Sequence, residues 1–363
     1  MTDCGFPVIT YSPDENPHQW GRAHGEQYRE AIRELVDIRR NLMAERNPDL
    51  TTEAIEHMAM SQYHVTAFCY KDLKSEFLGI VEGADVSIED LVILNNYTDF
   101  RDIPMPADEG CSVAFVNYNR NPVCGQTWDM HSSAKRYVCC LEVPCDGYEL
   151  PAVLFSLVGC LGMMGFHPSG RMVGVNNINT NKAGAGLIWP ALIRALLTRS
   201  SHKEMVRHLA DAPVTSGHAY LLASPAAGEF WEVMPGLAEQ VGRLFVSEDG
   251  YLFHTNHCLG ADAKLRETVI GKNSTTYIRY DLLKKKISSV KSFDQMCELM
   301  NDHENYPKSI CSNFQTDSQD PSITCGGAVG ELNTGKVVMW RGDQMYDDNF
   351  VRHDFNLGVP SVA

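Results

Sequence analysis

The hydrophobic period of the chain changes at Cys111, and this change limits the available folds more than any other feature. Before Cys111, apolar residues recur at steps of three and four, as at Tyr28, Ile32 and Leu35 within residues 18–45, which is the period of a helix. After Cys111, apolar and polar residues alternate loosely with the period of two that strands show. The sequence therefore predicts a helical first segment and a strand-rich second segment.

The first segment is expected to contain three long helices and one short helix. They cover residues 18–45, 52–70, 71–81 and 91–94. Ser87-Ile-Glu-Asp90 has the form of a capping box in front of the last helix. Residues 101–109 contain two prolines and four charged residues, a composition that favours a loop suited to an exposed cut.

The second segment is expected to begin with a strand hairpin, formed by residues 111–118 and 123–128 around a turn at 119–122. Further strands are expected over residues 137–143, 152–158, 172–178, 220–223, 230–233, 251–255, 323–332 and 336–340. Helices are expected over residues 189–198, from 202 onward, and over 275–286 and 293–300. Many strands with a few inserted helices predict an α+β fold, in which sheets pack together and are covered by helix layers.

Net charge and cysteine usage restrict the partners and the compartment. The formal charge is −15, from 31 Lys and Arg against 46 Asp and Glu, and such a surface repels phosphate backbones and anionic lipid. We therefore expect neither nucleic acid nor a membrane as partner. The twelve cysteines are irregularly spaced without a CxxC pair, and the first residues do not form a signal peptide, so a reducing, cytoplasmic compartment is expected.

Glu109-Gly-Cys-Ser112, at the junction of loop and strand, carries the most informative chemistry. Gly110 lets the backbone take conformations closed to other residues, including the approach that an intramolecular attack requires. The Cys111 thiol can attack the Gly110 carbonyl, and hydrolysis of the thioester then leaves Cys111 as a new N-terminus. Its α-amine titrates near about pH 8 and can serve as base for its own thiol. The alternative is that Cys111 is one more buried thiol among twelve.

Two further segments supply groups suited to this nucleophile. Gly125-Gln-Thr-Trp-Asp129 lies on the return strand of the hairpin, where a carboxylate beside an N-terminal ammonium would orient it and influence its pKa. Phe253-His-Thr-Asn-His257 ends another strand, and the amide of Asn256 is a suitable oxyanion donor. The alternatives are a turn-terminating aspartate and a plain cap at a strand end.

In this order and spacing, the segments resemble the acyl-coenzyme A:6-aminopenicillanic acid acyltransferase family, the C45 peptidase group of N-terminal nucleophile hydrolases, which includes N-β-alanyl amine hydrolases. The resemblance covers most of the chain. It rests on Trp20-Gly-Arg-Ala-His-Gly25, Gly79-Ile-Val-Glu-Gly-Ala-Asp-Val-Ser-Ile-Glu-Asp-Leu91, Gly110-Cys111, Gly125-Gln-Thr-Trp-Asp129, Gly174-Val-Asn-Asn-Ile178 and His254-Thr-Asn-His257.

The resemblance implies a four-layer αββα sandwich with a helical N-terminal segment. It also implies autoproteolysis into residues 1–110 and 111–363, which stay associated as one domain. By the same resemblance Cys111 is the nucleophile and cleavage point, Asp129 supports the amine, and Asn256 stabilises the oxyanion.

One departure from the family pattern concerns an arginine that often follows an Ile-Cys pair in the last third of the chain. Ile310-Cys-Ser-Asn-Phe has no arginine there, and Arg341 is too far along to be assumed its equivalent. Substrate anchoring by such an arginine is therefore not predicted.

Several other residues are candidates for lining the pocket, although turn asparagines and structural histidines explain most of them equally well. They are Trp128, His131, Asn176, Asn177 and His254. His254, His257 and Cys258 together suggest a metal, but no second ligand cluster completes a tetrahedral site, so no metal is expected.

The sequence thus predicts an autoproteolytically activated cysteine amidohydrolase that cleaves a small or non-peptide N-acyl amide through a thioester. Two alternatives stay open: an acyl-CoA-dependent N-acyltransferase with the same nucleophile, and an uncleaved homologue that only binds a small amide. No cofactor is expected, because the free amine replaces an external base. The expected partners are a small-molecule amide, an acyl-CoA in the transferase case, and the other half of the cleaved chain.

Overall fold

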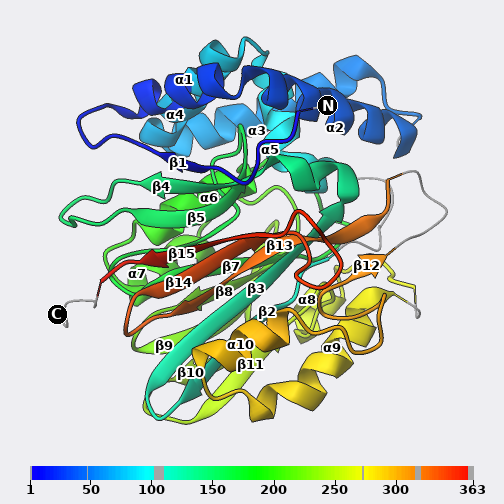
Figure 1. Cartoon of the computed structure of the whole chain (residues 1–363). Helices are drawn as coiled ribbons and strands as arrows, with labels where there is room; N and C mark the ends of the chain where they lie inside the picture. Colours follow the sequence, from blue (N-terminus) through cyan, green and yellow to red (C-terminus); the bar gives the residue numbers. More distant parts are fainter. Residues whose placement is uncertain (1, 47, 102–109, 272–273, 315–319, 359–363) are drawn as a thin grey trace.

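Two β-sheets are stacked face to face between layers of helices, as the computed structural model in Figure 1 shows. The structure describes residues 2–46, 48–101, 110–271, 274–314 and 320–358. The largest cluster of buried apolar side chains includes residues of both sheets and of the N-terminal helices, and a second cluster lies between one sheet and the helices that cover it. The four-layer αββα sandwich is confirmed.

The two sheets are mostly antiparallel. The eight-stranded sheet has the order β1 (Val8–Thr10), β4 (Val138–Val143), β5 (Ala152–Leu157), β6 (Met164–Phe166), β7 (Met172–Asn177), β8 (His218–Ala223), β9 (Ala227–Met234) and β10 (Leu237–Phe245). The seven-stranded sheet has the order β11 (Gly250–His254), β2 (Val113–Tyr118), β3 (Asn121–His131), β13 (Ser322–Glu331), β14 (Lys336–Arg341) and β15 (Val351–Asn356), with β12 (Asn313–Phe314) paired to β13. The hairpin predicted at Cys111 is confirmed as β2 and β3.

Helices cover the outer face of each sheet. On the eight-stranded sheet, α6 (Trp189–Leu197) and α7 (His202–Ala210) contact the strands. Five N-terminal helices extend this layer from α6: α1 (Pro17–Gln27), α2 (Arg29–Arg46), α3 (Thr52–Cys69), α4 (Lys71–Ala84) and α5 (Ile88–Arg101). On the seven-stranded sheet, α9 (Thr275–Lys286) and α10 (Phe293–Met300) contact the strands. The short helix α8 (Ala261–Lys264) lies beside β9 and β10 of the eight-stranded sheet.

The helices of the first segment follow the predicted ranges with two differences. Residues 18–45 form two helices rather than one, because the backbone leaves the helical region at Tyr28, with φ −114° and ψ 24°. The short helix predicted over 91–94 extends over all of α5. Its capping box is confirmed, since the Ser87 and Asp90 side chains each accept a hydrogen bond from the other residue's backbone N–H, at 3.0 and 3.3 Å.

Helices α1 and α4 touch backbone to backbone through two pairs of glycines. A Cβ added to Gly21 or Gly25 would overlap the backbone of α4, and one added to Gly79 or Gly83 would overlap the backbone of α1. These glycines belong to two of the segments that carry the family resemblance. Their small size therefore has a structural cause, which is the close approach of the two helices.

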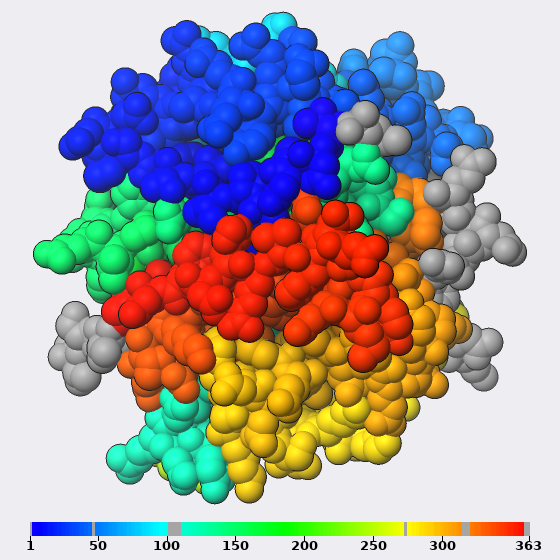
Figure 2. Space-filling view, in the orientation of Figure 1, coloured from blue at the N-terminus to red at the C-terminus, as the bar shows by residue number. Residues whose placement is uncertain are grey.

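Segments near the two ends of the described chain lie side by side on one face of the molecule. Figure 2 shows the first residues lying against the C-terminal strands. The Phe6 ring stacks on His353 of β15 at a centroid distance of 5.0 Å, and His353 Nε2 donates to the Phe6 carbonyl at 2.8 Å. Strands β1, β10 and β15 were not predicted, because β1 is only three residues long and the two others lie at sheet edges with mixed polar and apolar faces. Among the described residues, no helix is both long and apolar enough to cross a membrane.

Candidate active site

Three neighbouring strands bring together the residues that the sequence assigned to chemistry. Cys111 lies two residues before β2, Asp129 lies on β3, and Asn256 lies two residues after β11. Since β2 pairs with β3 on one side and with β11 on the other, the three side chains converge at one end of the seven-stranded sheet. All three are buried, with 8%, 4% and 7% of their surface exposed.

The backbone of Cys111 is held on both sides by buried polar side chains. Its N–H donates to Asn256 Oδ1 at 2.8 Å. Its carbonyl accepts from Asn176 Nδ2 at 2.8 Å and from Arg279 Nη1 at 2.6 Å. The bond from Arg279 is charge-assisted and therefore stronger than the two neutral ones, and the three together closely determine the position of residue 111.

Arg279 is the residue of the site that the sequence did not reveal. It lies on α9, is 1% exposed, and also donates to Asn256 Oδ1 at 2.9 Å. Its Nε lies 3.9 Å from a carboxylate oxygen of Asp129. One signal was available: Arg279 falls at helical spacing from Leu282 and Leu283 on the buried face of α9, where a lone cation needs a specific partner.

The Asn256 amide is oriented by its partners. Its oxygen accepts from two donors, the Cys111 N–H and Arg279, while its Nδ2 donates to the Asn177 carbonyl at 2.8 Å. This leaves one hydrogen of the amide nitrogen for another acceptor. Asn256 therefore presents an acceptor to the Cys111 backbone nitrogen and a donor toward Asn177.

Asp129 is buried beside Arg279 and is hydrogen-bonded by hydroxyl groups. Thr324 Oγ1 donates to Oδ1 at 2.7 Å and Ser312 Oγ donates to Oδ2 at 3.5 Å. Burial raises the pKa of the Asp129 carboxyl to about 6, although Arg279 and the hydroxyls of Thr324, Ser312 and Thr127 act to lower it. The desolvation of the carboxylate thus outweighs its partners.

Gly110 is confined by the same residues. A Cβ at this position would overlap the guanidinium of Arg279 and the amide of Asn256. The Gly110 carbonyl accepts a hydrogen bond from the backbone N–H of Asp129 at 3.0 Å. Close packing therefore requires glycine here. The conformational reason that the sequence suggested is not seen, because Gly110 is not among the glycines with a positive φ in the described chain.

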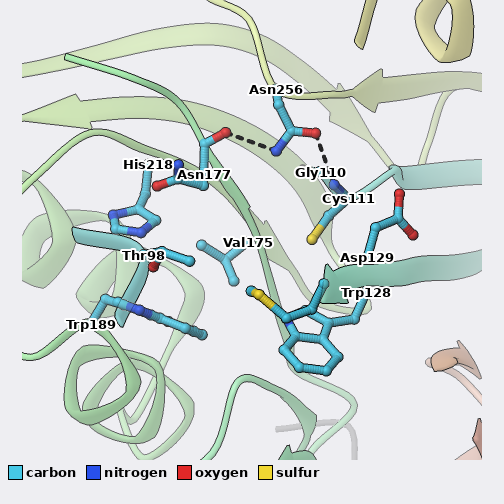
Figure 3. A pocket seen from close by; sticks show the side chains of 11 residues that line it. Thr98, Gly110, Cys111, Trp128, Asp129, Val175, Asn177, Trp189, His218 and Asn256 are labelled. Carbon is cyan, nitrogen blue, oxygen red and sulfur yellow. Dashed lines mark hydrogen bonds between the residues drawn. The ribbon is translucent and has the colours of Figure 1, made fainter. Parts of the chain in front are cut away.

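A small pocket of about 30 Å³ opens next to Cys111. Figure 3 shows Cys111, Asp129 and Asn256 at one end of it and Thr98, Trp189 and His218 at the other. The remaining lining residues are Gly110, Trp128, Met130, Val175 and Asn177. His218 and Thr98 were not anticipated, and His218 Nε2 lies 3.3 Å from a carboxylate oxygen of the buried Asp99.

The pocket candidates named from the sequence divide into two groups. Trp128 and Asn177 line the pocket, and Asn176 holds the Cys111 carbonyl behind it. His131 and His254 lie elsewhere: His131 contacts the Tyr97 hydroxyl at 3.1 Å, and His254 contacts the Glu232 carboxylate at 2.8 Å and is fully buried. Both histidines are held by partners away from the pocket lining.

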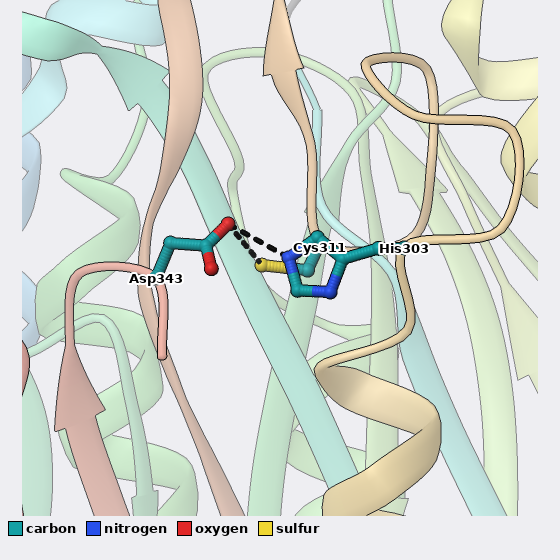
Figure 4. A group of neighbouring side chains, drawn as sticks. All are labelled: His303, Cys311 and Asp343. Atoms are coloured by element: carbon teal, nitrogen blue, oxygen red, sulfur yellow. Dashed lines mark hydrogen bonds and ion pairs between the residues drawn. The ribbon is translucent and has the colours of Figure 1, made fainter. Parts of the chain in front are cut away.

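Ser312 directly follows the Ile310-Cys311 pair, after which the family pattern often has an arginine, and its hydroxyl contacts Asp129. Arg341 lies away from the site, with Nη1 2.6 Å from Asp3 Oδ1. The only described group of three metal-ligand side chains is His303, Cys311 and Asp343, whose ligand atoms lie within 4.8 Å of one another (Figure 4).

These three side chains also satisfy one another without an ion. One carboxylate oxygen of Asp343 accepts from His303 Nε2 at 2.8 Å and from the Cys311 thiol at 3.4 Å. The other accepts from the backbone N–H groups of Met345 and Tyr346. The cluster fixes the backbone next to Ser312, and it thereby supports the segment that contacts Asp129.

Comparison with known proteins gives three findings. A family model described as Acyl-coenzyme A:6-aminopenicillanic acid acyl-transferase matches residues 116–342, a stretch that begins after Cys111. A relative from Emericella nidulans, named Acyl-coenzyme A:6-aminopenicillanic-acid-acyltransferase 40 kDa form, is 23% identical over 354 residues, covering 95% of this chain and 96% of that protein. A solved structure of a mutant conjugated bile acid hydrolase from Clostridium perfringens aligns with a TM-score of 0.39 and 9% identity, covering 68% of this chain and 92% of that one.

The relative from Emericella nidulans bears the name of an acyltransferase. The family match covers Asp129, Asn256 and Arg279 and well over half of the 363 residues. The chain belongs to the acyl-coenzyme A:6-aminopenicillanic acid acyl-transferase family.

Proposed function

We propose that the chain is an N-terminal nucleophile enzyme that cuts its own Gly110–Cys111 bond and then hydrolyses a small or non-peptide N-acyl amide through a Cys111 thioester. The observation that carries this proposal is the fixation of residue 111. Its N–H faces Asn256, its carbonyl faces Asn176 and Arg279, and the preceding carbonyl faces the Asp129 N–H. Buried polar side chains, rather than a neighbouring strand, thus hold the backbone of Cys111 beside the pocket.

Self-cleavage begins with attack of the Cys111 sulfur on the Gly110 carbonyl carbon. The Asp129 N–H, 3.0 Å from the carbonyl oxygen, stabilises the negative charge that develops on it. The C–N bond then breaks, the nitrogen takes up the proton that the Cys111 thiol lost, and Gly110 is held as a thioester. Water hydrolyses this thioester, which leaves a carboxylate on Gly110 and a free amine and thiol on Cys111. The expected chains are residues 1–110 and 111–363.

In turnover the new α-amine takes the proton of the Cys111 thiol, and the sulfur attacks the substrate carbonyl. Asn256 Oδ1 already lies 2.8 Å from this nitrogen and orients it, while the buried Asp129 carboxylate balances the ammonium that forms. The Asn256 amide hydrogen that remains stabilises the oxyanion. The amine product leaves, and water releases the acid from sulfur.

The transferase direction needs only a different acceptor, since an amine in place of water would resolve the same thioester. The family name and the relative's name favour acyl-CoA as the donor in that case. Gly110 forms part of the wall of the small pocket. Its departure after the cut enlarges the space beside Cys111 for a substrate.

The test is the intact mass of the purified protein under denaturing conditions. We expect two masses, for residues 1–110 and 111–363, and a single uncut mass for Cys111→Ala. Cys69→Ala removes an exposed cysteine and should be cut like the wild type. An uncut wild type would favour the alternative of a non-catalytic amide-binding homologue. A Cys111→Ala variant that is still cut would show that Cys111 is not the nucleophile of the cleavage.

A further inference from the structure

A second, larger hollow of about 840 Å³ lies between the start of α4, the β4–β5 connection and the residues that follow α6. Cationic and aromatic side chains form much of its wall, among them Lys71, Arg171, Arg199, Trp20 and Tyr148. Pockets for small organic ligands typically have about 300–1,000 Å³. The hollow is therefore large enough for a molecule of nucleotide size.

Arg171 is a buried cation whose charge no carboxylate balances among the described residues. It is only 8% exposed, yet it takes part in none of the ion pairs of the described chain. By contrast, three other buried arginines, Arg194, Arg279 and Arg341, lie 2.9, 3.9 and 2.6 Å from carboxylate oxygens. Burying an unpaired charge is costly, so an uncompensated guanidinium in a cavity wall indicates an anionic ligand.

The hydrogen bonds that Arg171 does form involve uncharged groups, and the Tyr148 side chain is one of its partners. Nη1 donates to the Ser200 carbonyl at 3.4 Å, and Nη2 lies 3.4 Å from Nδ1 of His167. Its Nε has no hydrogen-bond partner among the described residues. Burial and the charge of Arg171 lower the pKa of His167 to about 4, so this imidazole is neutral at pH 7. The guanidinium fork is thus available to a stronger acceptor.

The other charges around the hollow leave it positive. Two further cations of the lining, Lys71 and Arg199, form no ion pair among the described residues. Two carboxylates of the lining, Asp72 and Asp146, likewise form no ion pair there. With Arg171, the lining therefore holds three unpaired positive side chains against two negative ones, although the net charge of the chain is −15. A cationic hollow on such a protein attracts anions selectively.

We propose that this hollow binds a small organic phosphate, with the phosphate group on Arg171 and the organic part along the aromatic wall. The guanidinium offers parallel N–H donors that match phosphate oxygens, and Arg199 and Lys71 add charge. Trp20 and Tyr148 offer faces for a ring. The site is separate from Cys111: Trp189 at the start of α6 lines the small pocket, whereas Ala195 near its end lines this hollow. The proposal therefore stands on its own residues and does not depend on the proposed function.

The experiment is calorimetric titration of the full-length protein with inorganic phosphate, adenosine monophosphate and acetate at constant ionic strength. We expect phosphate to bind, adenosine monophosphate to bind more tightly, and acetate to bind more weakly than phosphate. Arg171→Met should weaken phosphate binding roughly tenfold or more, because a charge-assisted hydrogen bond is lost. Arg207→Gln, which changes an exposed arginine outside the hollow, should bind like the wild type.

A thermal melt separates a binding role from a structural one. If Arg171 serves a ligand, Arg171→Met without phosphate should melt at the wild-type temperature or higher, since an uncompensated buried charge has been removed. Added phosphate should then raise the melting temperature of the wild type but not of the variant. Three results would overturn the proposal: no phosphate binding by the wild type, unchanged binding by Arg171→Met, or acetate binding as tight as phosphate. Arg171→Lys, which keeps the charge without the fork, provides the same test if the methionine variant does not fold.

Discussion

The Arg279 side chain links the three residues of the candidate site to one another. It contacts the Cys111 carbonyl, Asn256 and Asp129, which lie far apart in the sequence. The hairpin and the place of Cys111 at its start could be predicted, because the hydrophobic period changes there. Asp129 and Asn256 could be named because they lie in segments that carry the family resemblance. Arg279 could not be predicted, since only the folded chain shows that α9 directs this side chain toward β2.

Replacing Arg279 with lysine should slow self-cleavage. Lysine keeps the positive charge but cannot donate from one planar fork to the Cys111 carbonyl and Asn256 together. Loss of one charge-assisted hydrogen bond of about 1.5–3 kcal/mol predicts a rate lower by roughly 10- to 150-fold. The time course of the two fragments after refolding measures it, with Arg207→Lys as an exposed control. Equal cleavage rates for Arg279→Lys and the wild type would show that the hydrogen bonds of Arg279 have no part in self-cleavage.

The raised pKa of Asp129 predicts a pH-dependent stability difference in the uncut chain. The folded state holds the Asp129 proton with a pKa of about 6, above the ordinary value of 3.8. The contribution of the raised Asp129 pKa to the free energy of unfolding is therefore fully present below about pH 4 and is lost as pH rises through 6. In the Cys111→Ala background, Asp129→Asn should gain up to roughly 3 kcal/mol relative to its parent between pH 4 and pH 7. Urea unfolding at several pH values measures this difference, and parallel profiles would contradict the assignment.

Among the structural elements, α1 and α4 are held by the closest helix contact. Gly21 and Gly25 on one helix and Gly79 and Gly83 on the other let the backbones touch. Both glycine segments carry the family resemblance in the sequence, but the sequence does not show why they need glycine. The hydrophobic pattern of one helix does not reveal which other helix packs against it. The edge strands β10 and β15 were missed for another reason, because they are partly exposed and mix polar with apolar residues, whereas the buried strands of the hairpin were found.

Gly79→Ala should destabilise the protein by about 1–3 kcal/mol, since the new methyl group must push two helix backbones apart. Gly184→Ala is the matched control, because a Cβ at Gly184 meets no atom within 4 Å. Denaturant midpoints of the two variants against the wild type give the comparison. If both variants shift by the same amount, the α1–α4 contact does not limit stability.

At the scale of the whole molecule, the proposed cut divides the chain but not the core. Strand β1 pairs in parallel with β4, with Ile9 opposite Leu141, and the α5 residues Val92 and Ile93 are completely buried. Each half therefore contributes to sheet and core that the other half needs. The proposed cut into residues 1–110 and 111–363 would break the covalent chain and leave the shared sheet and core in one piece.

The processed protein should consequently unfold in one transition. Separation of the halves would expose apolar surface from both, which favours all-or-none loss of structure. Calorimetry together with size-exclusion chromatography in increasing urea tests this expectation. The two fragments should elute together up to the unfolding midpoint, and early release of the smaller fragment would show that the halves are independent.

The parallel pairing of β1 with β4 has a consequence for how such an enzyme can be made. A strand that joins a sheet through backbone hydrogen bonds needs no peptide link to the strand beside it, and Val8, Ile9 and Thr10 dock in register with Cys140, Leu141 and Glu142. Two messenger RNAs, one for each half, could thus yield the mature assembly by co-translation and complementation. In such a split enzyme the second polypeptide would start at Cys111 once its initiator methionine was removed, and the active form would arise without any self-cutting step.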